Sequence, residues 1–372
     1  MKRILCLISC MNAGGAETFL MKLYRQMDKS QYQLDFCINV KEKCFYEDEI
    51  LSMGGRIFRI PSKSENRKEF ARQLTQIIQT EGYESVLRIT SNAMGFMDLK
   101  IAKKAGAKIC AARSSNSSDG KGWKPWVAHR MGKLLYGKYV DVKFAPSDLA
   151  AIYTFGQKAY DQGKVTILHN AVDLDVFSYS DEGRNAIRQE LGVDEATVLV
   201  GHVGRFDPQK NHGQLLDIYA EIAKKQPQSK LLLVGQGKLQ EQVQEKAKAL
   251  GIADRVIFAG VRSDIPRVLS AMDVFVFPSL YEGMPNTVIE AQATGLPCII
   301  ADTITREADI TGLVQYLSLE TSAEQWADRA LKVAKQPRRD THGDFIKNKY
   351  DIQSIADEFV SLCSGRDEEA KV

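Results

Sequence analysis

The sequence has no uninterrupted apolar run of about 18 residues, the length that a helix needs to cross a bilayer. This absence predicts a protein without a membrane-spanning helix. The first residues, MKRILCLIS, combine basic residues with an apolar run, as a signal peptide would. The run ILCLI is too short for that role, and the Gly-Gly turn after it favours a first β-strand.

Cysteine and histidine are sparse and do not cluster. The seven cysteines are scattered, several of them in apolar stretches, and none has CxxC spacing. This pattern favours reduced core residues of a cytosolic protein and excludes a secreted disulfide framework. The five histidines form no HExxH or comparable spacing. The sequence therefore predicts no metal site and no cofactor.

Charge is unevenly distributed between the two halves. Residues 1–170 contain 27 Lys and Arg against 16 Asp and Glu, a net charge of +11, whereas residues 171–372 contain 23 against 31, a net charge of −8. A basic half favours a nucleic acid, an anionic membrane surface or a phosphate-bearing substrate as partner. No aromatic-basic module is present, so we expect no nucleic acid. A chance distribution over solvated faces is the alternative.

Strand-like and helix-like segments alternate along both halves of the 372 residues, which suffice for two domains. The order predicts two doubly wound α/β domains with parallel sheets and a boundary near 170–185. Ligands of such sheets bind at the carboxyl ends of the strands, so a cleft between the two sheets is the expected active site. The segment 344–363 is an amphipathic helix that could pack on either domain.

Two motifs at predicted strand ends suit phosphate binding. Gly14 and Gly15 would let backbone amides at a helix start approach a phosphate, although a tight turn with positive φ is the alternative. In GRFDPQKNH, residues 204–212, Arg205 and Lys210 would aim two cations at a diphosphate. A solvated basic loop is the alternative for this motif.

Two further motifs suit the rest of a sugar nucleotide. In SLYEGMPNTVIEAQATGLP, residues 279–297, Glu282 follows the predicted strand VFVFP and could hold a sugar hydroxyl. Glu290 lies about one turn into the next predicted helix and could accept both hydroxyls of a ribose. Backbone groups around Val261 and Arg262 could read a nucleobase edge, although any αβ turn could look similar. The helix-start amides that would face a phosphate belong to Asn286, Thr287 and Val288.

The stretches EGMPNTVIEAQATGLPCIIAD, GRFDPQKNH, ILHNAVDLDVF and GGAE resemble the retaining glycosyltransferases of family 4, which have the GT-B fold. More narrowly, they resemble the branch that builds bacterial capsular polysaccharides and exopolysaccharides. The resemblance covers about residues 1–320. It implies two facing Rossmann-like domains, an acceptor-side domain over 1–172 and a donor-binding domain over 173–344. It also implies a C-terminal helix over about 345–372 that crosses back onto the first domain.

The resemblance further implies metal-independent transfer from a nucleotide sugar, with UDP favoured over GDP, to a glycan or a lipid-linked polyprenyl-diphosphate acceptor. Arg205 and Lys210 would stabilise the charge that develops on the departing diphosphate, and the acceptor hydroxyl would attack from the same face. The implied donor-binding residues are Gly14, Gly15, Arg205, Lys210, Val261, Arg262, Glu282, Gly283, Met284, Pro285, Asn286, Thr287, Val288 and Glu290.

One segment departs from the family pattern. In AARSSNSS, residues 111–118, Arg113 and Ser115 stand where the family has histidines, whereas Asn116 matches. Arg113 could donate a hydrogen bond to the sugar or a phosphate, but its high pKa excludes it as a base. The candidate catalytic residues are Glu282, Arg205, Lys210 and Arg113. The alternatives are a catalytically weak sugar-nucleotide-binding subunit of another transferase and, less favoured, a sugar-nucleotide epimerase.

The stretch after this segment has a membrane-interface composition. Trp123 and Trp126 flank Lys124 within a run of basic residues. We expect this stretch to rest on the cytoplasmic leaflet of the inner membrane beside a lipid-linked acceptor, which predicts a peripheral cytoplasmic protein. A mobile acceptor loop with one buried tryptophan is the alternative. The other residues expected on the acceptor side are Ser114, Ser115 and Asn116.

Overall fold

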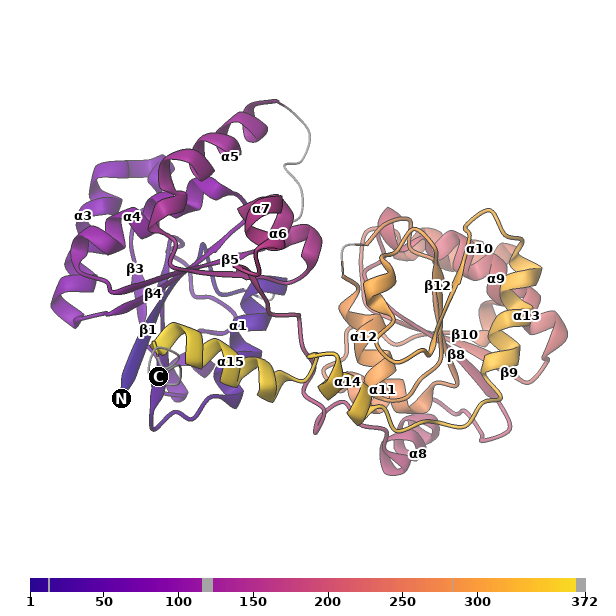
Figure 1. The fold of residues 1–372 in the computed structure, drawn as a ribbon. Coiled ribbons are helices and arrows are strands. Elements are labelled where there is room, and N and C mark those ends of the chain that lie inside the picture. The colour runs from indigo at the N-terminus through magenta and orange to yellow at the C-terminus, as the bar shows by residue number, and fades with distance from the viewer. Residues whose placement is uncertain (13, 116–122, 283, 366–372) are drawn as a thin grey trace. The chain divides into compact units, whose positions relative to one another are not determined.

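The computed structural model describes residues 1–12, 14–115, 123–282 and 284–365. The chain forms two compact units (Figure 1). The N-terminal unit comprises Met1–Ala171 and Lys349–Val372, and the C-terminal unit comprises Val172–Asn348. Among the helices of the described ranges, none combines the length and the apolar character that a bilayer crossing requires.

Within the described ranges, the N-terminal unit contains a seven-stranded parallel sheet with the order β3-β2-β1-β4-β5-β6-β7. Chain order runs outward from β1 on one side and from β4 on the other, so the topological switch point lies between them. The strands are β1 (Lys2–Leu7), β2 (Tyr32–Ile38), β3 (Ile57–Arg59), β4 (Ser85–Thr90), β5 (Ile109–Ser114), β6 (Val142–Ala145) and β7 (Thr166–Ile167). The α-helices are α1 (Gly15–Gln26), α2 (Glu47–Ser52), α3 (Lys63–Glu81), α4 (Phe96–Ala105), α5 (Trp123–Tyr136), α6 (Asp148–Phe155), α7 (Gln157–Asp161) and α15 (Ile352–Ser364).

Alternate strand residues of this unit enter two cores, because successive side chains of a strand point to opposite faces. Ile4 and Cys6 pack with α1 and α15 on one face. Leu5 and Leu7 pack with α3 and α4 on the other. A sheet that is covered on both faces explains why its strands contain nearly continuous apolar runs.

The segment 344–363 is not the single helix that the sequence predicts: it is divided at residues 348–351 into α14 (His342–Lys347) and α15, and Lys349 between them has φ +57°. The second of these helices, α15, returns the chain to the N-terminal unit. Its apolar residues recur at helical spacing, and Ile355 and Phe359 are buried in the core that α1 also lines. The Ser85 hydroxyl at the start of β4 donates to the carbonyl of Cys363 at 2.7 Å. The end of α15 is therefore fixed to the sheet through a buried hydrogen bond as well as through apolar packing.

The described part of the C-terminal unit contains a six-stranded parallel sheet with the order β10-β9-β8-β11-β12-β13, and its switch point lies between β8 and β11. The strands are β8 (Val198–Val203), β9 (Ser229–Val234), β10 (Val256–Phe258), β11 (Val274–Phe277), β12 (Cys298–Ala301) and β13 (Val314–Leu317). The α-helices are α8 (Asp181–Glu190), α9 (His212–Lys225), α10 (Gln240–Ala249), α11 (Ile265–Ala271), α12 (Asn286–Ala293), α13 (Ala323–Val333) and α14 (His342–Lys347). Both units therefore have the doubly wound α/β architecture that the sequence predicts.

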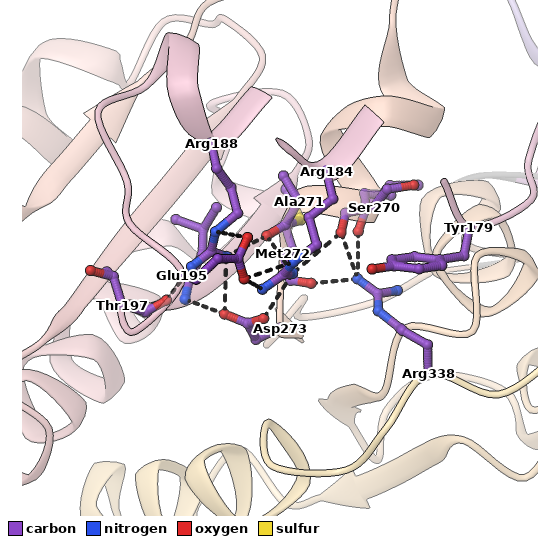
Figure 2. Close-up of polar contacts among 12 residues, drawn as sticks. Tyr179, Arg184, Arg188, Glu195, Thr197, Ser270, Ala271, Met272, Asp273 and Arg338 are labelled. Carbon is purple, nitrogen blue, oxygen red and sulfur yellow. Dashed lines mark hydrogen bonds and ion pairs between the residues drawn. The ribbon is translucent and has the colours of Figure 1, made fainter. Parts of the chain in front are cut away.

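Arginines fasten the amino ends of this sheet, at the edge opposite the strand ends that bind ligands (Figure 2). Asp273, directly before β11, lies 3.0 Å from Arg184 Nη1 and 3.4 Å from Arg188 Nη1. Arg338 donates to the carbonyl of Leu269 at 2.8 Å, and its guanidinium carbon lies 5.2 Å from the centre of the Tyr179 ring. These contacts join α8, the start of β11 and the segment after α13.

Candidate active site

The loops that follow β8 and β11 meet at the switch point of the C-terminal sheet. The amide of Leu280 donates to the carbonyl of Gln209 at 2.8 Å. The Gln209 side chain donates to the carbonyl of Tyr281 at 2.9 Å. These bonds hold the motif 204–212 against the motif 279–297. Two stretches that are distant in sequence therefore form one site, at the place where α/β sheets bind ligands.

Glycines let the loop backbones approach closely. A Cβ atom at Gly204 would lie 3.3 Å from the aliphatic stem of Lys210. Gly235, after β9, has φ +134°, and a Cβ atom there would collide with the carbonyl of Gly204. Glycine at both positions therefore lets the turns after β8 and β9 approach each other, and Gly204 leaves room for the Lys210 stem and the His202 ring.

Lys210 and Glu282 form a largely buried ion pair. The Nζ–Oε1 distance is 2.6 Å, and the two side chains are 14% and 10% exposed. Lys210 Nζ also lies 4.7 Å from the centre of the Phe277 ring. An ammonium has three N–H donors, and within the described residues Glu282 takes one of them in a hydrogen bond. The remaining donors can bind the oxygens of an anionic ligand without breaking the pair.

Arg205 lies on the same loop and is directed to solvent. Its side chain is 79% exposed, and its Nη2 lies 3.5 Å from Asp207 Oδ2. Asp207 also accepts from the Lys210 amide at 3.3 Å and so caps the short 3₁₀ turn Pro208–Lys210. An exposed ion pair of this length stabilises little. The guanidinium can therefore turn to grip two phosphate oxygens at small cost.

Helix α12 starts directly after the β11 loop, as the sequence predicts. Pro285 precedes it without a side-chain cap, and the amide of Val288 donates to the Pro285 carbonyl at 3.0 Å. Gly295, just after its end, has φ +66°. The half-buried residues of this segment are Met284, Asn286, Thr287 and Glu290. Gly283 lies outside the described residues.

Two carboxylates hold the side chain of Arg262. Its Nε donates to Asp264 Oδ1 at 2.8 Å, and its Nη1 donates to Glu190 Oε1 at 2.5 Å. The hydrogen bonds that Arg262 donates to Asp264 and Glu190 raise its pKa above the usual range. The guanidinium thus joins α8 to the loop before α11. The predicted contact with a nucleobase edge involves backbone groups of this loop, so the side-chain ion pairs do not conflict with it. Val261 beside it has an exposed side chain.

Arg113 of the N-terminal unit is enclosed by protein. It is 1% exposed, and its guanidinium carbon lies 3.6 Å from the centre of the Phe19 ring. Its Nη2 donates to the carbonyl of Leu168 at 3.3 Å and to Asn170 Oδ1 at 3.0 Å. Burial lowers the pKa of Arg113 to about 9, so the group remains charged at neutral pH. In this position it joins β5 to the chain segment that follows β7.

The two serines after Arg113 differ in environment. Ser114 is buried, and its hydroxyl lies 2.5 Å from that of Thr154. Ser115 is exposed, and its amide donates to the carbonyl of Thr90 at 2.9 Å. Ser115 is therefore the one of this pair that can meet a ligand. Asn116 and the side chain of Lys124 lie outside the described residues.

The Gly14–Gly15 turn opens α1 without positive φ. Gly14 is the N-cap, with φ −114°, and Gly15 is not among the positive-φ glycines. A Cβ atom at Gly14 would instead collide with the carboxylate of Glu17. Glycine here serves close approach of the Glu17 side chain to the helix start, and the alternative of a strained turn is wrong.

Comparison with known proteins decides the family. The sequence model of the family described as glycosyl transferases group 1 matches residues 183–352. Over 353 residues the chain is 36% identical to EpsF of Bacillus subtilis (strain 168), which is provisionally classed as a glycosyltransferase, and this match covers 93% of the chain and 91% of EpsF. This chain belongs to the glycosyl transferase group 1 family. The Arg205–Lys210 motif and the two glutamates of the transferase lie inside the matched region.

Further comparisons concern the fold and one relative. The transferase superimposes on the structure of Anabaena HepE in complex with UDP with a TM-score of 0.75 and 17% identity, covering 98% of this chain and 100% of HepE. This likeness shows the GT-B fold, as the sequence predicts. The UDP-Gal:alpha-D-GlcNAc-diphosphoundecaprenol alpha-1,3-galactosyltransferase of Escherichia coli is 35% identical over 145 residues, 38% of each chain.

Two buried histidines behind Lys210 are not foreseen from the sequence. The rings of His202 (β8) and His212 (α9) lie 4.8 Å apart, and His212 stacks on Phe206 at 4.3 Å. Neither ring nitrogen of His212 has a hydrogen-bond partner among the described residues. Burial lowers the pKa of His212 to about 4 and that of His202 well below its usual range. Both rings are therefore neutral at pH 7, which no sequence signal reveals because burial sets it.

Acidification is expected to destabilise the C-terminal unit of the transferase through His212. Between pH 6.5 and pH 4 the unfolded chain binds a proton that the folded imidazole does not, so the free energy of unfolding falls by on the order of 3 kcal/mol. His212→Phe should remove this loss and should be neutral or stabilising at pH 7, because no partner of the ring nitrogens is lost.

Urea unfolding at pH 7 and pH 4.5 measures this effect. Trp326, fully buried in the C-terminal unit, is the fluorescence reporter, because Trp123 and Trp126 are exposed. An equal loss of stability on acidification in the wild type and in His212→Phe would show that His212 does not carry the effect.

Proposed function

We propose that this transferase moves a sugar from a UDP-sugar to a glycan or lipid-linked acceptor, with retention of anomeric configuration, in the synthesis of a bacterial polysaccharide. The observation that carries the proposal is the Lys210–Glu282 pair beside exposed Arg205 at the switch point of a parallel sheet. HepE was solved with UDP, and the name of the E. coli relative includes UDP-Gal and a diphosphoundecaprenol-linked acceptor. Both support a UDP donor and a lipid-linked acceptor here.

In this proposal the cations act on the leaving group. The bond between the anomeric carbon and the diphosphate breaks, and negative charge develops on the diphosphate. The unused donors of Lys210 and the guanidinium of Arg205 stabilise that charge, and the partial burial of Lys210 strengthens the interaction because water screens it less. The acceptor hydroxyl attacks the same face of the sugar, and its proton leaves with the diphosphate.

In this proposal the two glutamates bind the two sugars of the donor, the transferred sugar and the ribose. Glu282 accepts a hydrogen bond from Lys210 through Oε1, and in this proposal its second carboxylate oxygen accepts one from a sugar hydroxyl. Glu290, eight residues further and half-buried in α12, binds the ribose hydroxyls. Arg113 supports the N-terminal unit in this scheme and acts by holding the Leu168–Asn170 segment, because it is enclosed.

A nucleotide-release assay tests the proposal. Purified protein receives a panel of UDP- and GDP-sugars, with and without EDTA, and membrane extract supplies the acceptor. Release of UDP from one donor, undiminished by EDTA, is the expected result and identifies the sugar. Measurable UDP binding without release from any donor would instead favour a sugar-nucleotide-binding subunit of another transferase. Conversion of the donor without an acceptor would favour an epimerase.

We further propose that helix α5 docks the transferase on the cytoplasmic face of an anionic membrane. Trp123, Trp126 and Leu134 are 71%, 48% and 84% exposed and recur at helical spacing. The Arg130 guanidinium lies 4.3 Å from the centre of the Trp126 ring, so a cation accompanies the apolar face. Exposed aromatic and basic side chains on one helix suit the interface of an anionic bilayer. Neither tryptophan is buried, which removes the alternative of one buried tryptophan.

Flotation with anionic liposomes measures this docking. The double variant Trp126→Ala, Leu134→Ala should lower the partition coefficient by about tenfold or more, because two large apolar side chains no longer enter the interface. Leu250→Ala, an exposed apolar residue of the C-terminal unit, is the matched control and should bind as the wild type does. Equal binding of the double variant and the control would remove α5 from the account.

A further inference from the structure

The N-terminal unit has a polar pocket of about 390 Å³ at the switch point of its own sheet. Residues that follow β1, β4 and β5 line it, together with the starts of α1 and α3, and β1 and β4 are adjacent in the sheet (Figure 1). Ligands of doubly wound sheets bind at this point, and the volume lies within the range of small-molecule sites. The residues of this unit that the donor motifs name, Gly14 and Gly15, are not among the lining residues.

Two cations share one buried carboxylate in the wall of this pocket. Lys63 Nζ donates to both oxygens of Asp98, at 2.7 and 2.9 Å, and Arg88 Nε lies 3.0 Å from Asp98 Oδ2. The Asp98 side chain is 1% exposed, whereas those of Lys63 and Arg88 are 28% and 13% exposed and line the pocket. Burial lowers the pKa of Lys63 despite the contact with Asp98. The wall therefore presents a surplus positive charge that is only partly hydrated.

The rest of the lining suits hydroxyl groups. Ser9 and exposed Ser115 supply hydroxyls to the same pocket. The Thr90 hydroxyl donates to the Asn92 carbonyl at 2.6 Å and so can only accept from a ligand, whereas Asn92, whose Oδ1 accepts the Met94 amide at 3.0 Å, can donate through Nδ2. Glu17, from the first turn of α1, adds one carboxylate, whose partner in the described structure is the weak donor Cys10 Sγ at 3.9 Å. The pocket thus combines a cationic wall, one carboxylate and several neutral polar groups. This lining is complementary to a sugar that carries an acidic group and several hydroxyls.

We propose that this pocket binds a sugar of the acceptor that carries one acidic group, either the carboxylate of a uronic acid or the phosphate of a sugar phosphate. The acidic group meets Lys63 and Arg88, and the hydroxyls meet the serine, threonine, asparagine and Glu17 side chains. A neutral sugar leaves the positive charge that Asp98 does not balance uncompensated and binds less well, because charge-assisted hydrogen bonds are about twice as strong as neutral ones. The identification of this pocket as an acceptor site rests on the proposed function. Binding of an acidic sugar to the pocket can be measured whether or not the protein turns over a donor.

Calorimetric titration tests the assignment with three probes: methyl glucuronide, N-acetylglucosamine 1-phosphate and methyl glucoside. Saturating UDP is present throughout to fill the donor site. One of the two acidic probes is expected to bind about tenfold or more tightly than methyl glucoside. The acidic probe that binds distinguishes a carboxylate from a phosphate.

Variants that change the charge of the pocket should change the affinity for the acidic probe in predictable directions. Arg88→Gln should weaken binding of the acidic probe by about tenfold, and Glu17→Gln should strengthen it by a few-fold, because a repelling carboxylate is removed. Ser115→Glu, at an exposed position, should weaken it. Opposite effects of Arg88→Gln and Glu17→Gln cannot result from loss of folding.

The outcomes separate this assignment from the proposed function. Arg205→Ala should weaken UDP binding and leave probe binding unchanged. Three results would each overturn the assignment. The neutral and acidic probes could bind equally, Arg88→Gln and Glu17→Gln could change binding in the same direction, or no acidic probe could bind at millimolar concentration while UDP binds. Binding of the acidic probe in a parallel titration without UDP, but not in its presence, would show that the pocket belongs to the donor site. Failure of nucleotide release with the probe results intact would overturn the proposed function alone.

Discussion

Replacing Lys210 with methionine is expected to lower the rate of nucleotide release by roughly 100- to 1,000-fold. The ammonium is held 2.6 Å from Glu282 and is 14% exposed, so its interaction with a developing phosphate charge is only weakly screened. The methionine keeps an apolar stem beside Gly204 and removes the ammonium together with its contacts to Glu282 and the Phe277 ring. Steady-state nucleotide release and calorimetric UDP binding measure the effect, and we expect UDP binding to weaken by about tenfold or more.

Glu282→Gln separates the two members of the pair. Removing the carboxylate should lower turnover strongly, because the donor sugar and Lys210 lose their charged acceptor. UDP binding should be unchanged or tighter, because no anion then competes with the diphosphate for Lys210. Lys248→Met, which breaks a surface pair with side chains 64% and 71% exposed, is the matched control and should change neither quantity. If Glu282→Gln weakened UDP binding as much as Lys210→Met does, the carboxylate would contribute to diphosphate binding rather than compete with it.

Asp273→Asn is expected to lower the free energy of unfolding of the C-terminal unit by about 3 kcal/mol. Figure 2 shows Asp273 between Arg184 and Arg188, whose side chains are 14% and 2% exposed. Asp273 also accepts the amide of Leu199 at 2.7 Å, so it fixes the start of β8 as well. Without its charge, the guanidinium of Arg188 stays buried with less compensation. Urea unfolding followed by Trp326 fluorescence measures the change in this unit.

Glu195→Gln is the control for Asp273→Asn. Glu195 approaches the same two arginines, at 3.0 and 3.6 Å, but its side chain is 64% exposed. Solvent screens that interaction, so the expected loss is less than about 1 kcal/mol. Equal losses in the two variants would contradict the argument from burial, because they would show that the arginines do not distinguish a buried carboxylate from an exposed one.

The sequence predicted the elements well where the pattern is local. Apolar runs gave the strands of both sheets except β13, the short edge strand Val314–Leu317, which the sequence analysis missed. The β11 loop and α12 lie where the two-glutamate motif placed them. The residues at which helices begin were harder to predict from the sequence. The apolar periodicity of α3 becomes clear only near Phe70, but the element extends back to Lys63, where Ser62 and Glu65 form a capping box. A non-helical kink at Asn66, whose Oδ1 accepts the amide of Glu69 at 3.0 Å, separates this first turn from the apolar part. The capping residues are polar and leave no trace in an apolar pattern.

Part of the candidate site was also predictable. Arg205, Lys210 and Glu282 were named from residue type and from their place at strand ends, and the structure brings Lys210 and Glu282 into contact. The sequence analysis placed both residues at strand ends but did not predict their contact, which results from the adjacency of β8 and β11 at the switch point of their sheet. The sugar-binding and catalytic roles of these residues stay predictions that the nucleotide-release assay tests.

The burial and the partners of individual side chains, by contrast, were decided by the tertiary structure. Arg113 and Arg205 are the same residue type at strand ends, but one is enclosed against Phe19 and the other is exposed. The sequence by itself determined the doubly wound fold, the family and the chemical groups available at each strand end, because these follow from local periodicity and residue identity. Only the tertiary structure decided which groups are buried and paired, because burial and partners depend on segments that are far apart in the chain and set the strength of every charge.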